Sequence, residues 1–101
     1  MPISVNVRTY TGQTPAVCTH PAINDLCRRA ETLALPMLGC VDPYDDTWFN
    51  KSQMRFLVPE LKTLIDSTSA TEAEIEAATE VLALTEQLEH KPHRYLIFSG
   101  D

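Results

Sequence analysis

The chain has 101 residues, a length that suits one compact domain, because chains divide into several domains only beyond ~250 residues. We therefore expect residues 1–101 to form a single domain. The hydrophobic fraction of 44% is that of a globular protein and excludes a disordered chain. Eight Lys and Arg against fourteen Asp and Glu give a formal charge of −6, which disfavours direct binding to nucleic acid or anionic lipid and favours a protein partner with a basic surface.

Apolar runs and cysteines indicate the compartment. No apolar run approaches the ~20 residues of a membrane-spanning helix, and none has the form of a signal peptide. The three cysteines, Cys18, Cys27 and Cys40, cannot all pair within one chain, and their spacing matches no zinc pattern. We therefore expect a cytoplasmic protein without a disulfide framework, a bound metal or a cofactor.

The two ends of the chain have the patterns of β-strands. Residues 3–10 alternate between two sides, as a half-buried strand does. One side consists of Ile3, Val5, Val7 and Thr9, and the other of Ser4, Asn6, Arg8 and Tyr10. The continuous apolar run at 95–98 predicts a central strand that is covered on both faces. Residues 11–19 have no sustained period and predict a loop, and a further short strand is expected at 38–41.

Two helices are predicted in the middle of the chain. Residues 21–34 repeat their apolar side chains on one face, and Pro21 suits the first helical turn because its missing N–H needs no partner there. The second helix is expected over 52–67, with Ser52 as its cap. Its outer face is predicted to consist of Lys51, Arg55, Glu60, Lys62 and Asp66. Pro59 lies inside this segment and predicts a kink or a later helix start.

A third helix is predicted from about residue 71 to residue 89. Two pairs have the spacing of a capping box, Ser69 with Glu72 and Thr71 with Glu74. Pro92 is expected to end the helix. The short polar connection before it predicts that the second and third helices form an antiparallel hairpin. The fold expected from these elements is α+β, in which a small sheet pairs the N- and C-terminal strands and about three helices pack on it.

The segment 42–50 combines the only Trp of the chain with further aromatic residues and three carboxylates. Tyr and Trp dominate protein interfaces, and adjacent carboxylates pair with a basic partner. We therefore predict a partner-binding site here, at Tyr44, Asp45, Asp46 and Trp48. The alternative interpretation is structural, with the Asp residues forming a turn and the aromatic residues pointing into the core.

Six glutamates in the third helix predict a negative outer surface, comprising Glu72, Glu74, Glu76, Glu80, Glu86 and Glu89. Such a surface mimics nucleic acid and would suit an inhibitor of a protein with a basic cleft, so Glu76 and Glu80 are added to the predicted partner-binding residues. The alternative is a solvated helix face. The edge of a small sheet is a second predicted contact, because it can add a strand from another chain.

Catalysis and metal binding have weaker signals. Gly39-Cys40 is the only nucleophile in a glycine-flanked turn, and nothing in the sequence places a histidine beside it. The carboxylates of 42–46 lack the glycine and the distal Glu of a calcium loop. His90 and His93 are three residues apart but are separated by a proline, and they have no acidic or cysteine ligand at a matching spacing. We predict that the protein is not an enzyme.

The segment Asp42-Pro43-Tyr44-Asp45-Asp46-Thr47-Trp48-Phe49-Asn50 resembles a segment found in small uncharacterised bacterial proteins. In its general build the chain is also similar to the immunity proteins of bacterial polymorphic toxin systems, which are short, acidic and cytoplasmic. This resemblance implies an inhibitor that binds and occludes one toxin domain. The alternatives are a homodimer or larger homo-oligomer with a regulatory or structural role, and a small enzyme.

Overall fold

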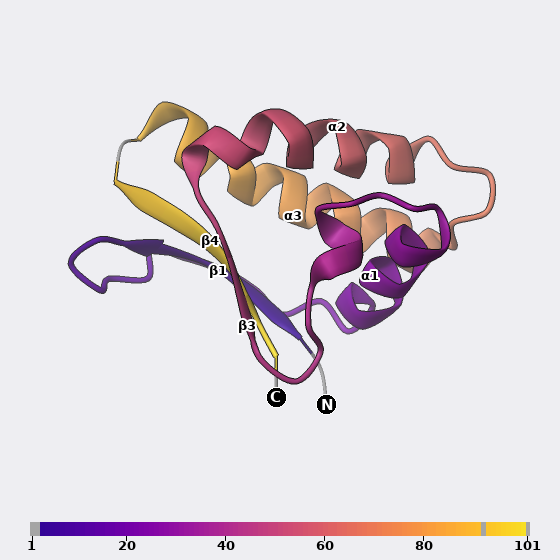
Figure 1. Ribbon diagram of the computed structural model, residues 1–101, viewed down its shortest axis with the longest axis horizontal. Helices are drawn as coiled ribbons and strands as arrows, with labels where there is room; N and C mark the ends of the chain where they lie inside the picture. Colours follow the sequence, from indigo (N-terminus) through magenta and orange to yellow (C-terminus); the bar gives the residue numbers. More distant parts are fainter. Residues whose placement is uncertain (1–2, 92, 101) are drawn as a thin grey trace.

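A computed structural model describes residues 3–91 and 93–100 of the chain (Figure 1). Its helices and strands form an α+β arrangement, as the sequence predicts. In chain order the elements are β1 (Ser4–Thr9), β2 (Ala16–Cys18), α1 (Ile23–Thr32), the 3₁₀ helix η1 (Leu38–Cys40), β3 (Asp46–Phe49), the 3₁₀ helix η2 (Lys51–Gln53), α2 (Met54–Ile65), α3 (Glu72–His90) and β4 (Arg94–Ser99).

The four strands form one antiparallel sheet in the order β2-β1-β4-β3. Its two central strands are the first and the last of the chain, and they pair over six residues, from Ser4 with Ser99 to Thr9 with Arg94. The predicted pairing of the two chain ends and the central position of the last strand are therefore confirmed. Figure 1 shows β1 and β4 crossing the molecule side by side, with the helices grouped on one side of the sheet.

The strand predictions fail at two short elements. Residues 11–19, predicted as a loop, contain β2, which has three residues and is too short to show a period of its own. The strand predicted at 38–41 is wrong, because Leu38–Cys40 is a 3₁₀ helix that inserts Leu38 into the core. The strand lies later, at Asp46–Phe49, where β4 supplies the hydrogen-bonding partner.

Helix α1 is two residues shorter at each end than predicted. It begins after Ala22, whose N–H donates to Nδ1 of His20 at 3.1 Å, so a histidine rather than Pro21 marks its start. It ends because Ala34 adopts a left-handed φ of 58°. The N–H of Leu35 then donates to the carbonyl of Ala30 at 2.9 Å, which satisfies one of the final carbonyls of the helix.

The N-terminus of α2 has a different cap from the predicted one. Asn50 accepts a hydrogen bond from the N–H of Gln53, and the Gln53 side chain accepts one from the N–H of Asn50. Ser52 is therefore not the cap but lies inside the 3₁₀ turn that this box opens. The α-helix itself begins at Met54, and Pro59 remains inside it.

Helix α3 begins at the predicted capping box of Thr71 and Glu74, rather than at Ser69. Its end at His90 is one residue beyond the predicted end, and Pro92 lies outside the described residues. The helix packs alongside α2, which confirms the predicted helical hairpin (Figure 1).

The hydrophobic core lies between the sheet and the helices. The inward side of β1 is the predicted one, because Val5 and Val7 are fully buried, and Phe98 and Leu96 lie opposite them on β4. The last strand is buried on both faces, as predicted, although in the described part of the chain the helices pack on this face alone. Ile97 points to the other face and is nevertheless buried, by side chains of its own sheet.

A buried carboxylate connects α2 to the turn that follows α1. Glu60 is 7% exposed, and its two carboxylate oxygens accept the N–H groups of Met37 and Leu38 at 2.9 Å each. It thereby caps η1 and fixes the connection between α1 and β3 onto α2. The prediction that Glu60 lies on the outer helix face is wrong, because the helical period cannot show that unpaired backbone donors of a distant turn will meet it.

We predict that Glu60→Gln lowers the free energy of unfolding by about 1.5–3 kcal/mol, because the amide loses the charge and turns an NH₂ group toward one of two backbone donors. Urea unfolding followed by circular dichroism measures this. Glu89→Gln, at an exposed position on α3, is the matched control and should change stability by less than about 0.5 kcal/mol. Equal stability of the two variants would contradict the capping role.

Gly100 marks a close approach of the C-terminal end of β4 to the turn before β3. Its N–H donates to the carbonyl of Asp45 at 3.0 Å. A Cβ at this position would lie 2.6 Å from the backbone nitrogen of Asp45 and 2.7 Å from the carbonyl oxygen of Asp42. The turn 42–45 is therefore seated directly on the backbone of Gly100.

We expect Gly100→Ala to destabilise the protein by about 1–3 kcal/mol, the usual cost of overpacking, because backbone atoms must move. The matched change is Gly39→Ala, where the nearest atom to the new Cβ would be Cα of Glu31 at 3.3 Å. Thermal unfolding should show the larger decrease in Tm for Gly100→Ala. The reverse order would show that the turn is not seated on Gly100.

Candidate protein-binding surface

One face of the sheet has no helix over it in the part of the chain that the structure describes. Strand register places Val17, Asn6, Ile97 and Trp48 in one row across β2, β1, β4 and β3. All four side chains point away from the helices, because their neighbours along each strand face the core. Val17 is 55% exposed and Trp48 is 46% exposed. Asn6 is buried in the middle of the row, with Nδ2 donating to Oγ of Ser99 at 3.3 Å.

Three aromatic rings run diagonally over this face. The rings of Tyr10 and Tyr95 stack with centroids 5.0 Å apart, and Trp48 meets Tyr95 edge-on at 5.3 Å. Tyr10 follows the last residue of β1, and its N–H donates to the carbonyl of His93 at 3.0 Å, which continues the β1–β4 ladder beyond the strands. We call Tyr10, Tyr95 and Trp48 the aromatic stripe.

Arg8 stabilises the Trp48 end of the aromatic stripe. Its guanidinium carbon lies 5.4 Å from the centroid of the indole ring, within the range of a cation–π contact. Arg8 belongs to β1 and Trp48 to β3, so the arginine side chain crosses β4 to reach the indole. Ile97 of β4 lies opposite Trp48 and is completely buried, although no helix in the described residues covers this face.

The polar groups of the aromatic stripe differ in their engagement. Hydrogen bonding to Tyr10 raises the pKa of the Tyr95 phenol, so this hydroxyl already has a partner within the stripe. Within the described residues, the indole N–H of Trp48 makes no hydrogen bond. A partner therefore meets aromatic rings with a hydrogen-bond donor at the Trp48 end, and Trp and Tyr are enriched at protein interfaces.

The predicted residues Tyr44, Asp45 and Asp46 lie in the turn that leads into β3. The Asp42 carboxylate accepts the N–H of Tyr44 at 2.8 Å, and Asp45 accepts the N–H of Asp46 at 2.8 Å. The structural interpretation is thus correct for the aspartates, and the partner-binding interpretation stays a prediction. The aspartates form the turn, whereas Tyr44 and the carboxylates remain exposed at its surface.

The two aromatic residues of β3 divide between the faces of the sheet. Phe49 packs edge-on against Phe98 in the core, and Trp48, its neighbour, lies on the uncovered face. Asp46 is two residues before Trp48 and therefore points to the same face. The structure thus brings Asp46 and Trp48 together, with Asp45 and Tyr44 beside them.

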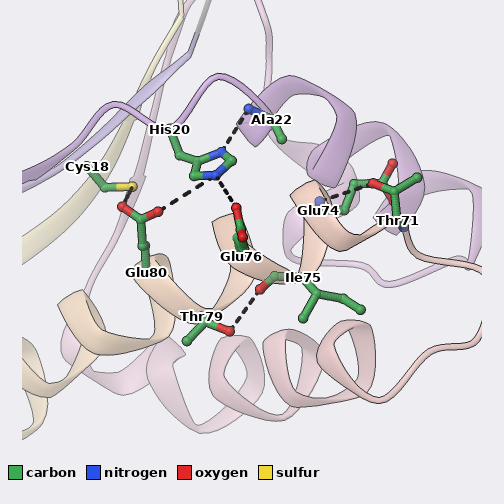
Figure 2. Close-up of polar contacts among 9 residues, drawn as sticks. All are labelled: Cys18, His20, Ala22, Thr71, Glu74, Ile75, Glu76, Thr79 and Glu80. Atoms are coloured by element: carbon green, nitrogen blue, oxygen red, sulfur yellow. Dashed lines mark hydrogen bonds and ion pairs between the residues drawn. The ribbon is translucent and has the colours of Figure 1, made fainter.

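Glu76 and Glu80 lie elsewhere, on α3, where they face the connection between β2 and α1 (Figure 2). Glu76 is 3.4 Å from Nε2 of His20, and Glu80 is 3.8 Å from the same atom. The thiol of Cys18, at the end of β2, donates to Glu80 at 3.6 Å. Because β2 and β3 are opposite edges of the sheet, the six predicted residues do not form one site.

The hydrogen bonds of His20 define the chemistry of this cluster. Its Nδ1 accepts the N–H of Ala22, so Nδ1 carries no proton and Nε2 carries the one that points to Glu76 (Figure 2). This tautomer cannot offer Nε2 to a metal ion or act there as a general base. The described residues contain no cluster of three or more His, Cys, Asp or Glu side chains arranged to hold a metal.

The two buried cysteines, Cys18 and Cys27, are held as thiols. Burial, together with the nearby Glu80 carboxylate, raises the pKa of Cys18, and burial alone raises the pKa of Cys27 to about 12. A nucleophilic cysteine needs the opposite shift. Cys18, Cys27 and the exposed Cys40 are all unpaired.

We predict that stability falls at alkaline pH through Cys27. Between its ordinary pKa of 9.0 and the folded value of about 12, the unfolded chain loses a proton that the folded chain keeps. The stabilisation is thus complete below pH 9 and is lost as the pH rises, by up to ~1.4 kcal/mol per pH unit. Urea unfolding between pH 8 and pH 10.5 should show a steeper decline for the natural chain than for Cys27→Ala. Parallel declines would contradict the assignment.

The acidic surface of α3 is less uniform than predicted. Glu74 is 5% exposed and pairs with Nε of Arg29 at 3.1 Å, while it also closes the capping box with Thr71. It connects α1 to α3 and is not available to a partner. Glu76 and Glu80 are engaged with His20, and the exposed carboxylates that remain are those of Glu72, Glu86 and Glu89.

Comparison with known proteins adds no relative, because no family model matches the chain and neither the curated proteins nor the solved structures yield a match. None of the helices in the described residues has the length and apolar character to cross a membrane.

Sequence reasoning missed Tyr10, Tyr95, Arg8 and His20 as functional candidates. Strand alternation in the sequence placed Arg8 and Tyr10 on one side of β1. Only the pairing of the strands shows that Tyr95 of β4 and Trp48 of β3 lie beside them.

Proposed function

We propose that this protein is a binding module that docks the uncovered face of its sheet on another protein. The aromatic stripe is the observation that carries the proposal. Two of its three rings are about half exposed or more, Tyr10 at 62% and Trp48 at 46%. The hydrophobic core lies on the opposite face of the sheet, so these rings do not contribute to it. Contiguous exposed apolar surface with a polar rim is characteristic of protein interaction sites.

The composition of the surface favours a partner of basic character. Asp45 and Asp46 are exposed beside Trp48, and the whole chain has a formal charge of −6. A basic partner is attracted at long range and then anchored by rings that lose little rotamer freedom on binding. Tyr44, which is 81% exposed in the adjoining turn, extends the surface at the same edge.

The specific form that we propose is an inhibitor of the immunity type, which acts in the cytoplasm by occluding one partner protein and performs no catalysis of its own. The rigid strands β1 and β4 support a preorganised contact surface, as tight inhibition requires. The sheet face also carries Arg8 and Asp46, which are of opposite charge, and this favours a homodimer as the second candidate. Light scattering distinguishes the two, because an inhibitor alone is a monomer.

We predict that Tyr10→Ser with Trp48→Ser weakens partner binding at least about 30-fold, the effect of losing one interface hot spot of about 2 kcal/mol. The tagged natural chain and the variant are used to capture partners from the lysate of the source cell, and the affinity of the captured protein is then measured by calorimetry. Asp46→Ala should weaken binding further by slowing association.

The chain offers a matched control on α2. Phe56 is 52% exposed and has the guanidinium carbon of Arg55 at 4.8 Å from its ring, so it repeats the pairing of Trp48 with Arg8 on a different surface. Phe56→Ser should leave affinity unchanged.

Glu76→Gln with Glu80→Gln tests the helix surface separately. If the α3 variant alone abolishes binding, the partner covers the helices and the proposed surface is incorrect.

A further inference from the structure

We infer that an extended segment of the partner adds to the sheet as a further strand, antiparallel to β2, with a basic side chain that faces Glu76 and Glu80. The inference rests on the proposed binding function and gives the partner a second contact beside the uncovered face. Strand addition occurs where a sheet edge has unpaired N–H and C=O groups. The sequence predicts such a contact without saying at which edge, and the two edges, β2 and β3, differ in those groups.

Hydrogen-bond alternation shows which backbone groups of β2 point outward. The N–H of Tyr10 donates to the carbonyl of His93, so the bonded pairs of β1 and β4 lie at every second residue from there. Val5 and Val7 lie between those pairs and therefore turn their N–H and C=O groups to the first and last residues of β2. The middle residue of β2, Val17, consequently turns both of its groups away from the sheet.

The outer edge of β2 is open from residue 15 to residue 19. The same alternation directs the C=O of Pro15 and the N–H of Thr19 outward, beside the two groups of Val17. Within the described residues these backbone groups make no hydrogen bond. All three residues are exposed, Val17 at 55%. Another extended backbone presents donors and acceptors at this spacing, so the edge specifies the class of its ligand.

The opposite edge of the sheet, β3, is closed by its own side chains. Its register with β4 turns the N–H groups of Asp46, Trp48 and Asn50 outward. Asp46 donates its N–H to the Asp45 side chain, and Asn50 donates its N–H to the Gln53 side chain, at 2.8 Å each. In the described chain a strand added there would find one open donor, that of Trp48. Strand addition is therefore assigned to β2.

Charge specifies one side of the added strand. The Cys18 side chain points to the helix side of β2, and its thiol donates to Glu80 at 3.6 Å (Figure 2). A side chain opposite Cys18 on the added strand would lie about 5 Å from it, so a lysine or arginine there would reach Glu76 and Glu80. His20 offers these two carboxylates one N–H between them, and their side chains are 72% and 53% exposed. A basic residue is therefore favoured on the helix side.

The same groups argue against a second copy of the chain as the occupant. Pairing of two β2 strands about Val17 would bring both copies of Glu76 and Glu80 to one junction. Each copy also has a formal charge of −6, so the two chains repel each other at long range. A basic segment of a partner meets the same carboxylates with the opposite charge, and it is the occupant that we assign.

Short synthetic peptides of alternating lysine and valine test the contact. When the lysines face α3, the valine N–H groups point to β2 and the lysine N–H groups point away. A peptide that is N-methylated at its valines therefore cannot pair, whereas one that is N-methylated at its lysines can. We expect calorimetry to show saturable binding of the unmodified and lysine-methylated peptides. The valine-methylated peptide, and a peptide with glutamate in place of lysine, should bind at least about tenfold more weakly.

Amide hydrogen exchange locates the contact in the natural chain, without a variant. The N–H groups of Val17 and Thr19 lie at an open edge and should exchange at least about tenfold more slowly with the lysine–valine peptide bound. The N–H of Trp48, on the opposite edge, is the internal control and should exchange at an unchanged rate.

Two variants separate the backbone contact from the charge. Val17→Pro removes the central N–H, a change that edge strands accommodate, and should abolish binding of the lysine–valine peptide. Glu76→Gln with Glu80→Gln should lower the affinity for this peptide about threefold or more. Glu86→Gln with Glu89→Gln is the matched control, because it makes the same change of charge at exposed positions farther along α3, and it should leave the affinity unchanged.

No saturable binding, equal binding of the valine-methylated and unmodified peptides, or unchanged exchange at Val17 and Thr19 overturns the inference. A dimer of the natural chain that Val17→Pro dissociates also overturns it, because the edge then belongs to a second copy. The proposed function is tested separately. If the peptides fail but Tyr10→Ser with Trp48→Ser still loses the captured partner, only the strand addition is incorrect. If the peptide binds as expected and that double variant retains its partner, the uncovered face is incorrect and the β2 contact stands.

Discussion

The antiparallel pairing of β1 with β4 is the contact on which the rest of the structure depends. It joins the first and last strands of the chain over six residue pairs, so the sheet cannot form until the ends meet. β2 and β3 then add to its two outer edges, and they have three and four residues. The same register places Tyr95 between Tyr10 and Trp48. One set of backbone hydrogen bonds therefore determines both the core and the candidate binding surface.

Buried carboxylates position the helices around that sheet. Glu60 holds the Met37–Leu38 turn on α2, and Glu74 connects α3 with Arg29 of α1. Each carboxylate compensates for its burial with hydrogen bonds from groups that would otherwise lack partners. Acidic residues that add to the negative charge of the chain therefore also contribute to its internal framework, and the charge available to a partner is concentrated in fewer places than the composition suggests.

The two faces of the sheet have divided roles. One face packs against the helices and supplies the stability of the fold. In the described residues no helix covers the other face, where Arg8 crosses β4 to Trp48 and Ile97 is fully buried. Such a face is rigid because the strands beneath it are fixed by the core, and this rigidity is what a binding surface needs to avoid ordering costs. The cluster of Cys18, His20 and Glu80, by contrast, connects the end of β2 and the residues after it to α3.

The sequence by itself determined the α+β class, the helical hairpin, the Thr71–Glu74 cap and the exposure of Asp45 and Asp46, because each depends on local periodicity or short-range hydrogen bonding. The pairing of the chain ends was also predicted, although it joins residues distant in the chain. The sequence also indicated Trp48 as a binding residue, which stays a prediction. Only the tertiary structure decided that β2 and β3 are strands, that Glu60 and Glu74 are buried, and that Tyr10 and Tyr95 join Trp48. Those features depend on partners distant in the chain, since a three-residue strand or a lone glutamate acquires its environment from the elements that pack on it.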